Sequence, residues 1–385
     1  MFIIGALIIA VAATAISAKT LVGYTAMPAY VKALTVLLIL LAWFAPVIIS
    51  SIRNYNLVGA DTFRWISNIG YFLFGTAFIL LILILFRDLL WFAFYEGAKL
   101  FKSPLSATFN PSAVKPLAYA NLGTVVLAFV VAFYALYEGI KTPAVKEIVL
   151  TSPKIKQEYT LVQLSDLHIN RAVPVSRLER LVKKVNALDP DVILLTGDIG
   201  DDKVEAVLPQ LEAMQDLYAP HGIYAVFGNH EFYNGLMPWQ FKFGDLGWTA
   251  LFNYGVPLKG TELYIGGIPD VSIARGSPFF KIDLDKTVDN SSEEQYKILL
   301  SHTPNFQREM ITKDQFDLVL AGHTHGGQIF PFHLLAKPAN DNFLAGLYDV
   351  NGSQMYVSRG TGYWGPPLRL FAPSEITVIK LLPQK

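Results

Sequence analysis

The segment PDVILLTGDIGDD (residues 190–202) joins a short, mostly apolar run to a turn with two glycines and three aspartates. Such a run, bounded by Pro190 and Gly197, is typical of a β-strand that is buried on both faces. Gly197 permits a tight turn after the strand. Asp198 then follows the carboxyl end of the strand, where the active sites of layered α/β proteins gather. The segment therefore predicts an α/β domain with a functional site at this strand end.

Four more strand-like runs end in the same way. Residues 160–164 precede Asp166 and His168, residues 222–227 precede Asn229 and His230, residues 296–300 precede His302, and residues 316–321 precede His323 and His325. Residues 175–189 have apolar positions at helical spacing and predict a helix between the first two strands. A single histidine after a strand is more often structural, but five of the seven histidines fall in these clusters. We therefore expect the clusters to form one shared site.

The side chains in these clusters indicate metal binding. Imidazole and carboxylate ligands without sulfur suit manganese, iron, zinc, nickel or cobalt, and the chain has no cysteine. Seven or eight such ligands are too many for one ion and fit two, with Asp198 as the natural bridging carboxylate. Two ions about 3.5–4 Å apart would hold the attacking and leaving oxygens of a phosphoryl transfer. We expect two divalent metal ions, with manganese as the best match.

The N-terminal part of the chain predicts a membrane region. Charged residues make up only 16% of the chain, against a usual fraction of ~25%. Four runs contain no Asp, Glu, Lys or Arg, namely residues 1–18, 33–52, 65–86 and 116–137. Each run approaches the roughly 20 apolar residues that cross a bilayer. We expect four transmembrane helices, of which the third ends near Arg87 and Asp88.

These patterns divide the chain into three parts. We expect an all-α transmembrane region over residues 1–140, a linker over residues 141–157, and an α/β catalytic domain over residues 158–385. Lysines and arginines near the spans are equally frequent on the two sides, so the positive-inside rule assigns no face to the domain. The formal net charge is zero, which gives no indication of a nucleic-acid partner. The prediction is a multi-pass integral membrane protein whose partner is the lipid bilayer.

The order of the motifs resembles that of one family. D-x-H at 166–168, G-D-x-x-D at 197–201, G-N-H-E at 228–231, a histidine at 302 and G-H-x-H at 322–325 are similar to motifs of the calcineurin-like metallophosphoesterase superfamily. The resemblance covers about residues 155–382. Flanking sequence such as GHTHGGQIFPF (322–332) is similar to a narrower branch, the membrane-associated and exported phosphohydrolases like YkuE and YaeI. The four-span start is similar to the transmembrane proteins with a metallophosphoesterase domain.

The resemblance implies a two-sheet β-sandwich flanked by helices and a role for each motif residue. One ion would be held by Asp166, His168, Asp198 and His325, and the other by Asp198, Asn229, His302 and His323. His230 would protonate the leaving oxygen, and Asp201 would hydrogen-bond His230 and raise its pKa. In an extended chain Asn229 and His230 would point in opposite directions, which favours only one of them as a ligand.

Three further features leave alternatives open. Glu231 is interpreted as structural support within its motif. Arg359 and Arg369 could each bind a substrate phosphate, or could form structural ion pairs. The aromatic residues at 232–248 could pack in the core or could line an apolar wall for a lipidic substrate.

The function expected from the sequence is that of a membrane-anchored phosphohydrolase. It would cleave a phosphate mono- or diester or a pyrophosphate through attack by a hydroxide that bridges the two ions. The substrate is either lipid-linked or soluble, and in the second case the spans act only as a tether. The alternative is a membrane sensor or transporter with a regulatory esterase domain. Spans without interior charge argue against transport.

Overall fold

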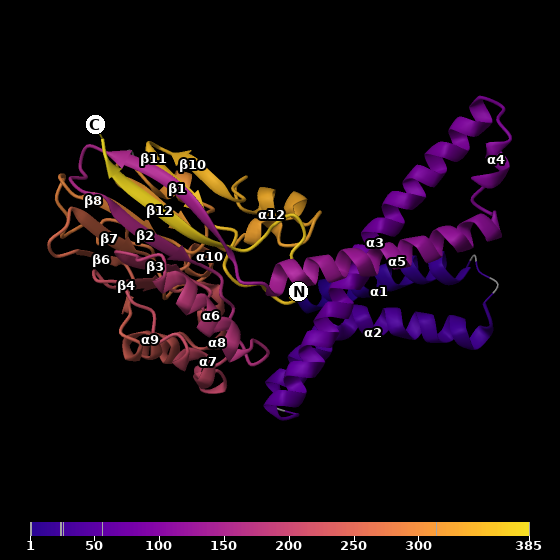
Figure 1. The fold of residues 1–385 in the computed structure, drawn as a ribbon, viewed down its shortest axis with the longest axis horizontal. Coiled ribbons are helices and arrows are strands. Elements are labelled where there is room, and N and C mark those ends of the chain that lie inside the picture. Colours follow the sequence, from indigo (N-terminus) through magenta and orange to yellow (C-terminus); the bar gives the residue numbers. More distant parts are fainter. Residues whose placement is uncertain (1, 24, 26, 56, 313, 385) are drawn as a thin grey trace. The chain divides into compact units, whose positions relative to one another are not determined.

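The computed structural model describes residues 2–23, 25, 27–55, 57–312 and 314–384, and it divides into two compact units (Figure 1). One unit comprises Met1–Tyr137 together with Gly365–Leu368, and the other comprises Glu138–Trp364 together with Arg369–Lys385. All described strands belong to the second unit, whereas the long helices belong to the first.

The first unit is built from apolar helices. They are α1 (Phe2–Gly23), α2 (Ala29–Asn54), α3 (Ala60–Leu100), α4 (Leu105–Thr108) and α5 (Val114–Ile140). Among the described residues, α2, α3 and α5 are long and apolar enough to cross a membrane, and α1 contributes a shorter apolar stretch, Leu7–Gly23. These helices indicate a membrane protein. The number of four spans stays a prediction.

Helix α3 extends beyond the third charge-free run. The sequence places the end of that span near Arg87 and Asp88, and the helix continues past them to Leu100, so that it is 41 residues long. The charge of Arg87 does not interrupt the helix, because its guanidinium pairs with Asp88 and also donates to the side chain of Asn121 on α5. Residues 60–103 contain no proline, which would break the helix, and the next proline after Pro46 is Pro104.

The second unit begins with a strand at a place where a linker was expected. Strand β1 (Ala144–Ser152) lies within residues 141–157 and pairs in parallel with the C-terminal strand β12 (Glu375–Pro383). The prediction of a linker is therefore wrong for these nine residues, which form a strand. The local sequence did not reveal β1 because it is an edge strand, whose residues are mostly exposed and whose partner lies over 200 positions away.

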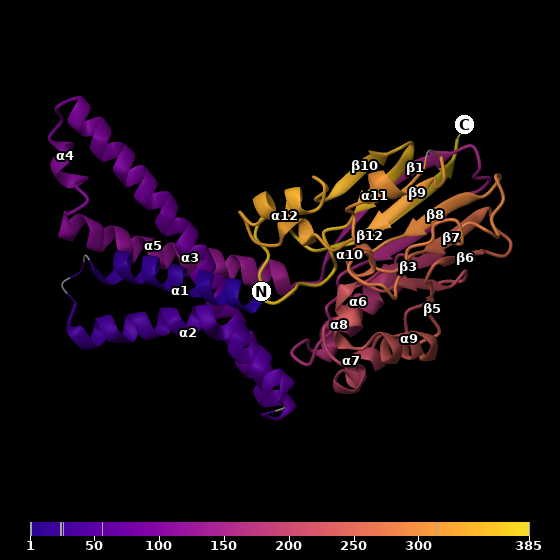
Figure 2. The same ribbon diagram turned by 180° about the vertical axis from the view of Figure 1, so that it is seen from behind.

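Two six-stranded sheets form the centre of this unit and lie face to face (Figures 1 and 2). The first has the order β1-β12-β2-β3-β4-β5, and the second has the order β10-β11-β9-β8-β7-β6. The remaining strands are β2 (Tyr159–Leu164), β3 (Val192–Thr196), β4 (Ile223–Val226), β5 (Thr249–Ala250), β6 (Tyr254–Pro257), β7 (Leu263–Gly267), β8 (Tyr296–Leu300), β9 (Leu318–Ala321), β10 (Gly346–Val350) and β11 (Ser353–Val357). The predicted two-sheet α/β fold is confirmed.

The central strands are buried on both faces, as their apolar runs predicted. In β3, Val192 and Leu194 pack between the sheets, whereas Ile193 and Leu195 pack in a second apolar cluster under helices. The helices of this unit are α6 (Val175–Asn186), α7 (Leu208–Glu212), α8 (Asn229–Asn234), α9 (Leu236–Asp245), α10 (Val271–Arg275), α11 (Gln307–Met310) and α12 (His333–Ala339), with the 3-10 turns η1 (Val204–Ala206) and η2 (His325–Gly327). A third apolar cluster covers the outer face of the second sheet.

The aromatic segment at 232–248 belongs mainly to the core. Trp239 and Phe243 of α9 are fully buried in the cluster beneath the first sheet, and Trp248 joins them. Core packing, rather than a wall for a lipidic substrate, therefore describes these three residues. Tyr233 and Phe241 are exposed.

Candidate metal centre

The polar clusters that follow the strands meet at one edge of the two sheets. Backbone hydrogen bonds hold their loops together, because Asp166 N donates to Gly197 O at 3.0 Å and His168 N donates to Asp198 O at 3.0 Å. The loops of the second sheet join them, since His323 N donates to the Asp166 carboxylate at 3.0 Å. Strands far apart in the sequence thus bring the predicted ligands to one place.

Five of the predicted ligands lie in the left-handed region of backbone conformation. Their φ values are 54° at Asp166, 48° at His168, 51° at Asp198, 69° at His323 and 51° at His325. This region is uncommon for residues with a side chain, and such strain gathers at functional sites. The loops therefore hold these side chains in orientations that an ordinary strand end would not give.

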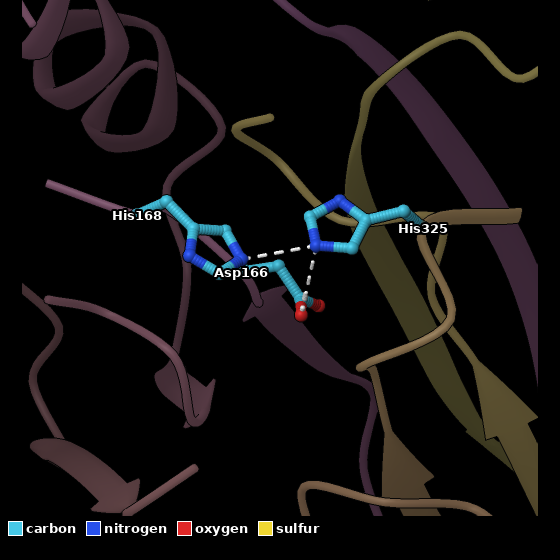
Figure 3. Close-up of side chains that lie close together, drawn as sticks. All are labelled: Asp166, His168 and His325. Atoms are coloured by element: carbon cyan, nitrogen blue, oxygen red, sulfur yellow. Dashed lines mark hydrogen bonds and ion pairs between the residues drawn. The ribbon is translucent and has the colours of Figure 1, made fainter. Parts of the chain in front are cut away.

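One group of ligands comprises Asp166, His168 and His325, whose side chains point toward one another (Figure 3). His168 Nε2 lies 3.0 Å from His325 Nε2, and His325 Nε2 lies 3.5 Å from Asp166 Oδ1. All three residues are buried. Two imidazole nitrogens and a carboxylate at this separation are suited to a divalent cation.

A second group comprises Asp198, His302 and His323. His302 Nε2 lies 3.2 Å from Asp198 Oδ2 and 3.2 Å from His323 Nδ1. The other ring nitrogen of His302 donates to the Thr196 carbonyl at 2.8 Å. A carbonyl only accepts, so this bond leaves Nε2 of a neutral His302 without a proton and free to bind a metal.

Asp198 lies between the two groups. Its Oδ2 is 3.8 Å from His168 Nε2 of the first group, in addition to its contact with His302 in the second. Asn229 is also buried, and its side-chain oxygen has no hydrogen-bond partner among the described residues. A buried oxygen without a partner is costly unless a ligand satisfies it. The residues present therefore fit divalent metal ions.

Two motif glycines are required by close approach rather than by turn geometry. A Cβ at Gly228 would collide with the Asp198 side chain, and a Cβ at Gly322 would collide with Ser165 and Asp166. Neither glycine has a positive φ. Gly197, with φ of 85°, does make such a turn.

His230 lies beside the metal ligands and is held by Asp201. Its Nδ1 is 2.6 Å from Asp201 Oδ1, whereas its Nε2 is 4.0 Å from Asp198 Oδ2. Asn229 and His230 begin helix α8, with Gly228 as the N-cap. The prediction that they lie in an extended chain is therefore wrong. Neighbouring residues on a helix still point in different directions. The rings of Tyr233 and Trp364, which the sequence did not single out, flank His230.

Burial and charge give the histidines different protonation states. Burial lowers the pKa of His168 to about 3 and that of His323 to about 4, so both are neutral at pH 7, as metal ligands must be. Burial also lowers the pKa of His302, but the Asp198 carboxylate outweighs it and raises the pKa well above its usual value. For His230, Asp198 and Asp201 outweigh burial in the same way and raise the pKa to about 9. A cation bound next to Asp198 would compete with the proton on His302.

Glu231 holds the loops together from beneath. It is fully buried, and its carboxylate accepts hydrogen bonds from the backbone N–H groups of Asp198 at 3.1 Å, Gly200 at 2.7 Å and Gly228 at 2.8 Å. Burial raises its pKa to about 8. The side chain thus connects the loop after β3 to the start of α8, consistent with its interpretation as structural support.

The two arginines lie in different environments. Arg359 is partly exposed and pairs with Glu375 at 3.3 Å. Arg369 is fully buried and donates to the carbonyls of Gly362, His325 and Ala372. Its Nη2 also lies 3.1 Å from His325 Nδ1, so Arg369 contacts a predicted ligand from behind.

Comparison with known proteins identifies the family. The family model described as "Calcineurin-like phosphoesterase" matches residues 159–327. YkuE of Bacillus subtilis, a metallophosphoesterase, is 32% identical over 241 residues, which cover 58% of this chain and 79% of YkuE. The chain belongs to the calcineurin-like phosphoesterase family. The family and the names of its relatives indicate a metal-dependent phosphoesterase.

Two other relatives add to this assignment. A metallophosphoesterase of Helicobacter pylori is 39% identical over 249 residues, 64% of this chain and 66% of the relative. The chain thus spans about two thirds of the length of that protein. The "Transmembrane protein with metallophosphoesterase domain" of Danio rerio is 32% identical over 286 residues, 70% of this chain and 65% of that protein. Membrane relatives of this kind agree with the apolar helices described above.

Proposed function

We propose that the chain is a membrane-anchored phosphohydrolase that uses two divalent metal ions, manganese being the best match. Its substrate would be a phosphate mono- or diester or a pyrophosphate carried by a lipid. The observation that carries this proposal is the position of Asp198, which lies within 4 Å of ligands in both groups. A carboxylate in that position is suited to bridge two ions.

The residues would divide as their contacts suggest. Asp166, His168 and His325 would hold one ion, Asn229, His302 and His323 would hold the other, and Asp198 would bind both. When bound, the ions would polarise the phosphoester and make a water molecule nucleophilic near neutral pH. The unpartnered oxygen of Asn229 supports its place in this set.

His230 would supply the proton to the leaving oxygen. Its Nδ1 donates to Asp201, so Nε2 carries a proton that can be donated only while the ring is positively charged. A raised pKa of about 9 means that the ring is protonated at pH 7 in the metal-free site. Asp201 would keep the ring in this orientation and would stabilise its charge.

The two arginines would have different tasks. Arg359 is partly exposed and remains the better candidate to bind a substrate phosphate. Arg369 donates its N–H groups to backbone carbonyls. We therefore propose that it positions His325 and does not bind substrate.

The test is an assay of the purified full chain in detergent with Mn²⁺. The substrates are nitrophenyl phosphate, bis-nitrophenyl phosphate and a panel of lipid phosphates and lipid pyrophosphates. We expect hydrolysis that disappears with a chelator and returns with Mn²⁺, together with close to two ions per chain by metal analysis. An active preparation with one ion or none would overturn the two-metal mechanism, and hydrolysis of soluble esters alone would overturn the lipid-linked substrate.

A further inference from the structure

The catalytic unit carries an apolar patch beside the metal centre that its core packing does not explain. The patch consists of five exposed large side chains: Phe330 (43% exposed), Phe332 (46%), Leu334 (64%), Leu335 (65%) and Phe371 (80%). Tyr218 and Phe279 are also exposed, as single apolar residues are on many protein surfaces.

A ring contact joins two members of the patch, and the other three follow Phe330 closely in the sequence. The rings of Phe330 and Phe371 lie 5.8 Å apart, and Ile329 forms β-bridges with both Leu370 and Phe371. Phe332, Leu334 and Leu335 follow in the turn that begins α12, whose buried residue is Ala336. The helix thus turns Ala336 toward the protein and leaves its two leucines facing outward.

The patch lies on two segments that position the predicted metal ligand His325. One segment runs from His325 through η2 to Phe330, and the other runs from Arg369, which donates to the His325 carbonyl, to Phe371. A surface that binds the patch would therefore lie next to the metal centre.

We propose that this patch inserts into the surface of the lipid bilayer that the chain's own apolar helices enter. Only Lys141, Thr142 and Pro143 separate α5 from β1, a reach of roughly 10 Å. The domain therefore stays close to a bilayer at a high effective concentration. The patch combines aromatic and leucine side chains with a nearby exposed lysine, Lys337. Segments that bind the interface of an anionic bilayer typically have this composition.

The proposal gives the substrate a direction of approach. A phosphoester at the level of the lipid headgroups would reach the metal centre beside the inserted patch, whereas a soluble ester would gain nothing from insertion. This consequence rests on the proposed phosphohydrolase function. The insertion itself does not, so the two can be tested separately.

The absence of cysteine from the chain makes the test specific. We would introduce Leu335→Cys, label it with an environment-sensitive fluorophore, and reconstitute the full chain in vesicles of phosphatidylcholine and phosphatidylglycerol. Phe279→Cys, on an exposed site outside the patch, is the matched control. We expect the label at 335 to be blue-shifted and quenched by lipids that carry a spin label on the acyl chain, and the label at 279 to be unaffected.

Two results would overturn the proposal. A label at 335 that is neither blue-shifted nor quenched, like the label at 279, would show that the patch stays in water. A label at 335 that is protected from water but not quenched by spin-labelled lipid would show that protein covers the patch, either another part of this chain or a second copy.

Activity provides a second measurement. The double substitution Leu334→Glu and Leu335→Glu should reduce turnover of a lipid phosphate in these vesicles by about tenfold. Turnover of nitrophenyl phosphate should be unchanged, which also shows that the variant is folded. Equal turnover of the lipid phosphate by both proteins would count against insertion.

Discussion

Asp198 is the residue on which the metal centre depends most. It contacts residues of both ligand groups, and it also lies with His168 and His230 in a third set of neighbouring side chains. We predict that Asp198→Asn loses both ions, and that His168→Ala loses one. Loss of outer partners alone costs ~10–100-fold in metal affinity, so loss of the shared ligand should exceed that range.

Metal analysis after dialysis, together with Mn²⁺ titration, measures this difference. A matched comparison is Asp202→Asn, which changes an aspartate of the same loop that pairs with Arg171 instead. If Asp198→Asn kept two ions and near-normal turnover, the assignment of Asp198 as the bridge would be wrong.

His230 should behave as an acid and not as a ligand. We predict that His230→Ala keeps both ions but loses ~10²–10⁴-fold in rate. The loss should be larger for an alkyl phosphate than for nitrophenyl phosphate, because nitrophenolate leaves without protonation. Asp201→Asn should show the same pattern more mildly, and the double variant should be little worse than His230→Ala, because the pair acts as one unit.

The pH profile provides an independent check on His230. A general acid is active below its pKa and is lost as the pH rises through it. Bound cations lower the pKa of a nearby imidazolium, so the high-pH limb of kcat/KM should fall at or below about 9 and should be absent from His230→Ala. A limb that persists in the variant, or loss of an ion from it, would return His230 to another role.

At the scale of elements, Glu231 connects the loop after β3 to the start of α8. We predict that Glu231→Gln lowers the free energy of unfolding by about 1–3 kcal/mol, because an amide NH₂ would face a backbone N–H that now has an acceptor. Metal affinity should fall as well, since both loops carry ligands. Glu179→Gln, on the exposed surface of α6, is the control. Thermal unfolding and Mn²⁺ titration would measure the two effects. If Glu231→Gln had the same stability and metal affinity as Glu179→Gln, this role of Glu231 would be contradicted.

Strand β1 is part of the catalytic fold and not part of a linker. A chain that starts at Thr142 keeps the β1–β12 pairing, whereas a chain that starts at Glu158 removes β1 and exposes the edge of β12. Because unpaired edges promote aggregation, we predict that the first is soluble and the second aggregates. Size-exclusion chromatography of both would decide, and two equally monomeric, equally stable proteins would contradict the prediction.

These elements show what local sequence can and cannot predict. The fully buried strands β2, β3, β8 and β9 were recognisable because each is an apolar run that ends in a polar motif. β1 was not, because an edge strand has no apolar run and its pairing is set by distant residues. The helical start of α8 and the close approach at Gly228 and Gly322 were hidden for the same reason: both depend on what packs against them.

At the scale of the whole molecule, the apolar helices matter for which substrates can be reached. The short segment between α5 and β1 keeps the domain near the bilayer, where a lipid-linked phosphoester is concentrated in two dimensions. Tethering of this kind typically raises apparent affinity by ~10²–10⁴-fold without any new contact. We predict that the full chain in vesicles and a chain starting at Thr142 have equal kcat/KM on nitrophenyl phosphate. On a lipid phosphate in the same vesicles, the shorter chain should be at least ~10²-fold slower at low enzyme concentration.

The soluble ester serves as the internal control in this comparison, because a misfolded or metal-free shorter chain would lose activity on both substrates. Added salt distinguishes a covalent tether from adsorption of the free domain to the bilayer through charge. Adsorption through charge alone would weaken as the ionic strength rises, whereas the covalent tether would not. Equal rates on the lipid phosphate with and without the helices, at low and high salt, would mean that the membrane part does not determine which substrate is cleaved. The helices would then serve only to place the protein in the membrane, and the search for its substrate should turn to soluble phosphoesters.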